Sequence, residues 1–168
     1  MTRRLPVLLG AVVVLVLGMV LGVRLLTAKV DVAEADPGCE DRTVRAGQPL
    51  TPNLVAVNVY NTSQRAGLAN RVSINLQRRG FLAGDVGNLA TKLRAKGTLI
   101  LTDTPDDSRV KLVAAQLNDV TIRKPDVPLK EGVTVVVGDG YAGMVSKAPR
   151  QVKATQTVSV CVPIVDVD

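Results

Sequence analysis

Ser108 and Lys111 are the residues whose types and spacing could support covalent chemistry, because they stand in the order Ser108-Arg109-Val110-Lys111. In this S-x-x-K spacing a lysine one helical turn after a serine can act on the proton of its hydroxyl. The S-D-N and K-T-G segments that accompany the pattern in penicillin-binding enzymes are absent, and the chain has no histidine to activate a nucleophile. The sequence therefore predicts a protein that is not an enzyme, and a serine–lysine hydrolase or transferase is the alternative.

Three carboxylates, Asp103, Asp106 and Asp107, surround a predicted strand-to-helix junction. Such a group could hold a calcium ion or supply a carboxylate pair for glycoside hydrolysis. Stabilisation of the positive end of a helix dipole explains the same residues more simply. The glycine-rich segment 138–143 lacks the Gly-Lys-Ser/Thr of a phosphate loop. We therefore expect no metal and no cofactor.

The first segment of the chain indicates export. Residues Leu5 to Val23 are uncharged and nearly all apolar, and at about 1.5 Å per residue they can cross the ~30 Å hydrocarbon core of a membrane. Arg3 and Arg4 precede them, which places the N-terminus in the cytoplasm and the remainder outside. The sequence thus predicts a single-pass cell-membrane protein with an extracytoplasmic domain. A cleaved secretory signal is the alternative, because Ala33-Glu34-Ala35 offers a small-x-small cleavage pattern.

The two cysteines, Cys39 and Cys161, stand near opposite ends of the exported part and are too distant in sequence for a C-x-x-C dithiol. An oxidising compartment favours a disulfide between them, which would close nearly the whole domain. The loop-entropy model assigns such a closure about 4–5 kcal/mol of stability. Two free thiols are the alternative.

Composition limits the partners of the exported part. Residues after Ala28 carry 18 Lys and Arg against 15 Asp and Glu, a net charge of +3. The adjacent basic pairs there, Arg78-Arg79 and Arg123-Lys124, are interpreted as solvated ends of elements. Aromatic residues make up only 2% of the chain, too few for base stacking. Nucleic acid is therefore not an expected partner.

Alternating strand and helix patterns follow a polar segment. Apolar or β-branched runs predict strands at 54–60, 81–86, 97–102, 120–122, 133–137 and 155–162. One helix is expected from a cap at 61–63 to Arg79, and a second from a capping Thr104. The fold class is therefore α/β, a small sheet with two helices in a βαβ-βαβ-like arrangement, preceded by one transmembrane helix.

Four regions result from this pattern. They are a cytoplasmic stub and transmembrane helix (1–28), a linker (29–52), an α/β domain (53–141) and a C-terminal strand tail tied by the disulfide (142–168). In open α/β sheets, ligands bind outside the carboxyl ends of the strands. The candidate ligand-binding residues are therefore Asn61, Arg65, Asp103, Asp139 and Tyr141, with Arg65 as the expected anion contact.

Several short motifs resemble the LytR C-terminal domain of cell-envelope proteins in actinobacteria and related Gram-positive bacteria. They are Val57-Asn58-Val59-Tyr60-Asn61, Gly67-Leu68-Ala69, Leu76 to Gly80-Phe81, and Val133 to Gly138 with Asp139. The resemblance spans residues 53–141 and implies a domain that stands alone behind one transmembrane helix. The LytR-CpsA-Psr phosphotransferase domain that precedes it in other members does not fit within 168 residues, so that activity is not implied.

Resemblance and composition together predict a non-catalytic, membrane-anchored module. We expect its extracytoplasmic domain to bind a cell-wall polymer or another envelope protein and so to support envelope integrity or assembly. Two alternatives remain: the serine–lysine enzyme, acting on wall substrates, and an accessory subunit of a wall-polymer ligase complex.

Overall fold

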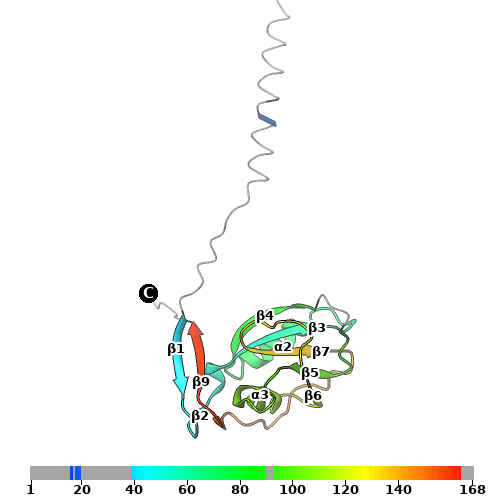
Figure 1. The fold of residues 1–168 in the computed structure, drawn as a ribbon. Helices are drawn as coiled ribbons and strands as arrows, with labels where there is room; N and C mark the ends of the chain where they lie inside the picture. Colours follow the sequence, from blue (N-terminus) through cyan, green and yellow to red (C-terminus); the bar gives the residue numbers. More distant parts are fainter. Residues whose placement is uncertain (1–15, 17, 20–38, 90–92, 164–168) are drawn as a thin grey trace, which may run out of the picture. The chain divides into compact units, whose positions relative to one another are not determined.

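The computed structural model describes residues 16, 18, 19, 39–89 and 93–163, and of Cys39, Cys161 and Pro163 it describes the backbone alone (Figure 1). The chain divides into two compact units, residues 1–37 and 38–168. The membrane span predicted at Leu5 to Val23 lies almost entirely outside the described residues. Residues 16, 18 and 19 of this span are described, and they are helical. Among the residues that are described, no helix has both the length and the apolar character that a membrane crossing requires.

A mixed five-stranded sheet forms the centre of the second unit, in the order β4-β3-β7-β5-β6 (Figure 1). Its strands are β3 (Ala56–Asn61), β4 (Leu82–Asn88), β5 (Thr98–Leu101), β6 (Val120–Arg123) and β7 (Val133–Val137). Strand β3 runs parallel to both β4 and β7, whereas β5 is parallel to β6 and antiparallel to β7. The α/β class predicted from the sequence is confirmed.

Two helices complete the predicted βαβ units. Helix α2 (Leu68–Gln77) connects β3 to β4, and helix α3 (Ser108–Ala114) connects β5 to β6. The apolar stripe of α2 is buried, as its spacing predicts, and so are most of the apolar residues of α3. Both stripes pack with Val57, Val59, Val135 and other alternate residues of the strands, so both helices cover the same face of the sheet.

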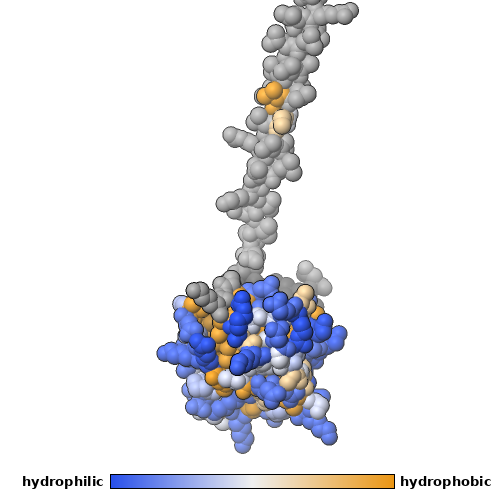
Figure 2. All heavy atoms as spheres, turned by 90° about the vertical axis from the view of Figure 1, so that its right-hand side faces the viewer, coloured by the Kyte–Doolittle hydropathy of each residue, from blue (hydrophilic) through white to orange (hydrophobic). Residues whose placement is uncertain are grey.

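The opposite face of the sheet carries a second, smaller apolar cluster. Leu99, Leu101 and Val136 are its buried members, and the loop residues Leu89, Leu93 and Leu129 pack against them. This face is therefore covered by chain segments outside the helices. Figure 2 shows one side of the unit as largely hydrophilic, with apolar atoms gathered in small patches between the polar ones.

Both helices begin later than the sequence predicts. Asn61 Oδ1 accepts hydrogen bonds from the Ser63 amide (2.9 Å) and hydroxyl (2.7 Å), which forms a local turn in place of a helix cap. Gly67 then adopts a left-handed conformation with φ 69°, so α2 starts only at Leu68. Helix α3 is capped by Asp107 and not by Thr104, whose carbonyl accepts from the Asp107 amide (3.1 Å) in a preceding turn.

The second half of the segment expected to be a linker, 29–52, is part of the fold. Residues 39–52 contain β1 (Cys39–Val44), β2 (Pro49–Leu50) and the start of the 3-10 helix η1 (Pro52–Leu54). Val44 and Leu50 are buried in the main core. The segment is polar in composition because β1 lies in a two-stranded ribbon, where only some of its residues meet the core.

The C-terminal tail pairs with that segment and not with the central sheet. Strand β9 (Val158–Pro163) is antiparallel to β1, and β8 (Val152–Lys153) is antiparallel to β2. Val158 and Val160 are buried, so the tail belongs to the same folded unit. In the β1–β9 register, Cys39 faces Pro163 and Cys161 faces Asp41, which sets the cysteines two positions apart on neighbouring strands. The predicted disulfide joins side chains outside the described part and stays a prediction.

Candidate functional site

Three of the five predicted ligand-binding residues meet where β3 and β7 end, because the two strands are parallel. The Arg65 guanidinium donates hydrogen bonds to the backbone oxygens of Asp139 (3.1 Å) and Gly138 (3.4 Å). The Asp139 carboxylate accepts from the amide of Gln64 (2.9 Å), and Asn61 Nδ2 donates to the Arg65 carbonyl (2.9 Å). These hydrogen bonds connect the β3–α2 loop to the turn after β7. The polar groups of the two segments are therefore paired with one another.

Of the other two predicted residues, Asp103 lies apart, whereas Tyr141 follows the turn after β7 and its amide donates to the Gly138 carbonyl at 3.1 Å. Asp103 follows β5, which is antiparallel to β7, so it lies at the other end of the sheet, with Lys124 Nζ 3.5 Å from its carboxylate. Tyr141 is half-buried, and its hydroxyl has no hydrogen-bond partner among the described residues. Burial raises the pKa of Tyr141, although the nearby charges of Arg79 and Arg65 act in the opposite direction. Of the five predicted residues, Asp103 is therefore the one that lies away from the ends of β3 and β7.

The S-x-x-K residues are engaged in separate contacts. Ser108 is fully buried, and its Oγ accepts a hydrogen bond from the Thr155 amide at 2.8 Å. Lys111 is exposed, with its Nζ 3.1 Å from an Asp106 carboxylate oxygen. The Ser108 hydroxyl therefore anchors the chain just after β8 to the first turn of α3. Asp106 and Asp107 likewise have local partners, since Asp107 caps α3 and pairs with Arg109 at 2.6 Å.

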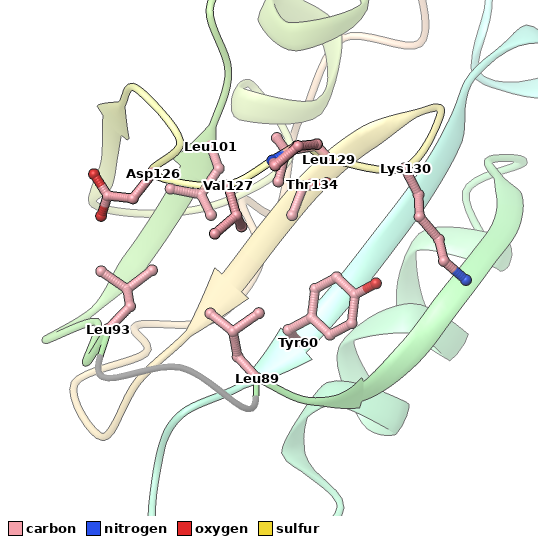
Figure 3. A pocket seen from close by; sticks show the side chains of 10 residues that line it. Tyr60, Leu89, Leu93, Leu101, Asp126, Val127, Leu129, Lys130 and Thr134 are labelled. Atoms are coloured by element: carbon pink, nitrogen blue, oxygen red, sulfur yellow. The ribbon is translucent and has the colours of Figure 1, made fainter.

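An apolar pocket lies on the sheet face that has no helices (Figure 3). Its volume is about 180 Å³. Its floor comes from residues of the central strands, and its walls come from the two loops that follow β4 and β6. The lining residues are Tyr60, Leu89, Leu93, Leu101, Asp126, Val127, Pro128, Leu129, Lys130 and Thr134. In Figure 3 the Leu89 and Leu93 side chains approach from one side, and those of Val127 and Leu129 from the other.

Charged groups mark the two ends of this pocket, Asp126 at one end and Lys130 at the other (Figure 3). Lys130 Nζ lies 2.6 Å from Asp85, which also accepts a hydrogen bond from the Tyr60 hydroxyl at 3.4 Å. The hydrogen bond from Lys130 lowers the pKa of Asp85, whereas burial and the negative charge of Asp85 raise the pKa of Tyr60. The Lys130 end of the pocket thus combines an aromatic ring with an ion pair.

Sequence reasoning missed this pocket, because its walls come from loops without periodicity. Leu89 and Leu93 precede β5, and Val127 and Leu129 flank Pro128 in a segment with no strand or helix. The available signal was a set of large apolar residues in segments for which no strand or helix is predicted. Val127 retains 50% of its exposure, so it borders the pocket at the surface of the domain.

The fold and this pocket define a two-layer α/β domain with one helix-covered face and one face that holds an apolar pocket. A family model described as "LytR cell envelope-related transcriptional attenuator" matches residues 54–141, just over half of the chain. The chain therefore belongs to this LytR_C family, as the sequence motifs predict.

Two further proteins are similar to the chain. The cell wall biosynthesis protein LcpA of Corynebacterium glutamicum is 28% identical over 125 residues, which cover 73% of this chain and 24% of that protein. The chain therefore spans about a quarter of the length of that relative. The soluble domain of a conserved hypothetical secreted protein from Mycobacterium marinum, known from a crystal structure, has a sequence 21% identical to this chain. It matches with a TM-score of 0.47 and covers 62% of this chain and 79% of that one.

Proposed function

We propose that this chain is a non-catalytic module of the cell envelope whose pocket holds an apolar chain of an envelope component. The apolar pocket on the helix-free face of the sheet is the observation that carries the proposal. Membership of a cell-envelope-related family and similarity to a cell wall biosynthesis protein support the location. The apolar run at Leu5 to Val23 would hold the domain beside the membrane, where lipid-linked components are concentrated.

The size of the pocket suits a short segment of an acyl or prenyl chain. An engineered apolar cavity of about 150 Å³ holds a benzene ring, so 180 Å³ accommodates about six carbon atoms. Burial of six methylene groups contributes at most about 5 kcal/mol, at about 0.8 kcal/mol each. This energy alone corresponds to a dissociation constant in the range of about 0.1–1 mM. The polar ends of the pocket, Asp126 and Lys130, would then supply selectivity for the groups attached to the chain.

The proposal is tested with residues 38–168, which form one compact unit with its own core. The neutral dye N-phenyl-1-naphthylamine fluoresces strongly in apolar surroundings, and decanol serves as the competitor. We expect saturable dye binding that decanol reverses. Val127→Asp places a charge in the pocket lining and should weaken binding about tenfold, because an apolar ligand in the pocket would remove water from the carboxylate, at a cost of about 1.4 kcal/mol or more.

Ile122→Asp is the matched control, since Ile122 has a similar exposed fraction (42% against 50% for Val127) but does not line the pocket. Circular dichroism establishes that both variants keep the fold. Equal dye binding by the Val127→Asp variant and the unsubstituted domain would contradict the proposal. An equal loss in both variants would show that the dye recognises exposed apolar surface in general.

A further inference from the structure

A second hollow of about 580 Å³ is lined by residues that follow α2 and α3, and three of its lining residues are arginines. Arg78 and Arg79 directly follow α2, and Arg150 comes from the loop before β8. The other lining residues include polar side chains and no carboxylate: Thr51, Pro52, Gly80, Gln116, Ser146, Ala148 and Pro149. This arginine groove shares no residue with the apolar pocket.

Arg79 is held in a fixed position within the groove. Its two terminal nitrogens donate hydrogen bonds to Gln116 Oε1 (2.9 Å) and to the Val145 carbonyl (2.6 Å). Gln116 is only 2% exposed, and its Nε2 donates to the Pro149 carbonyl at 2.8 Å. The buried amide thus connects the end of α3, the guanidinium and the 145–149 loop, and it organises the groove before any ligand arrives.

The positive charge of the groove has no counterpart within the described part of the chain. Arg42, Arg109 and Arg123 each lie within 4.0 Å of a carboxylate, but no ion pair of the described residues includes Arg78, Arg79 or Arg150. Three guanidinium groups around one hollow repel one another unless an anion lies between them.

The negative end of the α2 dipole is the simpler explanation for basic residues after a helix. It applies to Arg78 and Arg79 by position, but Arg79 donates to groups outside α2. It does not apply to Arg150, which follows no helix. The dipole therefore does not account for the convergence of the three side chains on one polar hollow.

We propose that the arginine groove binds a phosphate or phosphodiester group. A guanidinium presents five N–H donors in a planar fork that matches the oxygens of phosphate. Arg79 uses two donors on Gln116 and Val145, which leaves three for a ligand. The volume of 580 Å³ exceeds that of a phosphate ion, so the groove has room for the groups that a phosphodiester joins. Thr51 and Ser146 supply hydroxyls that suit such polar groups.

The test uses the full chain in dodecyl maltoside, an uncharged detergent, and isothermal titration calorimetry. Inorganic phosphate, glycerophosphoglycerol and acetate are the titrants, so that free phosphate, a phosphodiester and a simple carboxylate are compared. The variants are Arg78→Gln, Arg150→Gln and the double substitution, chosen because both side chains are exposed. Arg123→Gln is the control for loss of one positive charge, because Arg123 lies in β6, outside the groove, where it pairs with Asp126.

We expect saturable binding of at least one phosphate titrant, stronger than that of acetate. Each substitution in the groove should weaken it about tenfold, as expected for loss of a charge-assisted hydrogen bond, and Arg123→Gln should change it less than twofold. Preference for glycerophosphoglycerol supports a polymer or headgroup source, and preference for inorganic phosphate supports the free ion. The proposal is overturned if neither phosphate titrant shows saturable binding, or if acetate binds as tightly as the phosphate titrants. It is also overturned if Arg123→Gln weakens phosphate binding as much as the substitutions in the groove do. Val127→Asp should leave phosphate binding unchanged, which separates this test from that of the apolar pocket.

Discussion

Replacement of Asp107 by alanine tests how the short helix α3 is held at the sheet. The Asp107 side chain is 3% exposed and accepts a hydrogen bond from the Arg109 amide at 2.8 Å. It also pairs with the Arg109 guanidinium at 2.6 Å. Loss of an N-cap costs about 1 kcal/mol. Loss of a charge-assisted bond costs about 1.5 kcal/mol, reduced here because the Arg109 side chain is 31% exposed and can reach water.

We therefore expect Asp107→Ala to lower the free energy of unfolding by about 2 kcal/mol, measured by urea denaturation. Asp103→Ala is the control, since the Asp103 side chain is 61% exposed and the substitution should change stability by less than about 0.5 kcal/mol. A loss below about 0.5 kcal/mol for Asp107→Ala would refute the assignment of Asp107 as the residue that fixes α3.

The same carboxylate makes a pH-dependent contribution. Burial alone would raise the pKa of Asp107, but the hydrogen bonds and charge of Arg109 outweigh burial and hold it below the ordinary value of 3.8. Because the folded-state pKa is depressed, this stability is fully present above the ordinary value and is lost as pH falls through the folded-state pKa. The stability difference between the unsubstituted chain and Asp107→Asn should therefore shrink below about pH 4. A difference that stays constant from pH 7 to pH 2 would contradict this explanation.

Three further outcomes follow from individual contacts. Gly138→Ala should sharply lower the midpoint of urea unfolding, because a Cβ at this position would collide with the Ala95 carbonyl oxygen. Gly87→Ala is the control, since a Cβ there meets nothing closer than 4.0 Å and should change the midpoint little. Ser108→Ala should cost about 1–2 kcal/mol, and a fluorophosphonate probe should leave the unsubstituted chain unlabelled; labelling at Ser108 would favour the enzymatic alternative. The chain isolated from an oxidising compartment should be lighter than its reduced form by two hydrogens, and two titratable thiols would rule out the disulfide between the cysteines of β1 and β9.

The sheet and the helix stripes could be predicted because each depends on local periodicity. The run Val133–Val137 is buried at every position, as a continuous β-branched segment indicates for a central strand. In α2, Leu68, Val72 and Leu76 recur at helical spacing and are all buried. Such patterns depend on the residues of one element and need no knowledge of its neighbours.

The predicted site was only partly assembled, because its geometry depends on strand direction. Asn61 and Asp139 meet since β3 and β7 are parallel, whereas Asp103 is at the other end since β5 is antiparallel to β7. The sequence of a strand carries no signal for its direction relative to a non-consecutive neighbour. The polar composition before Pro52 likewise predicts a linker, because the strands that pair with this segment, β8 and β9, come from the far end of the chain.

The topology explains why one face of the sheet is free to form a pocket. Parallel strands joined through a helix are connected with right-handed geometry, which fixes the face on which the helix lies. From β3 to β4 the chain moves outward in one direction, and from β5 to β6 it moves outward in the other with the strands reversed. A twofold rotation about the normal to the sheet relates these two paths. Such a rotation does not exchange the two faces of the sheet, so α2 and α3 lie on the same face. Among the described residues, the loops after β4 and β6 are the segments that pack on the other face, and the apolar pocket lies between them.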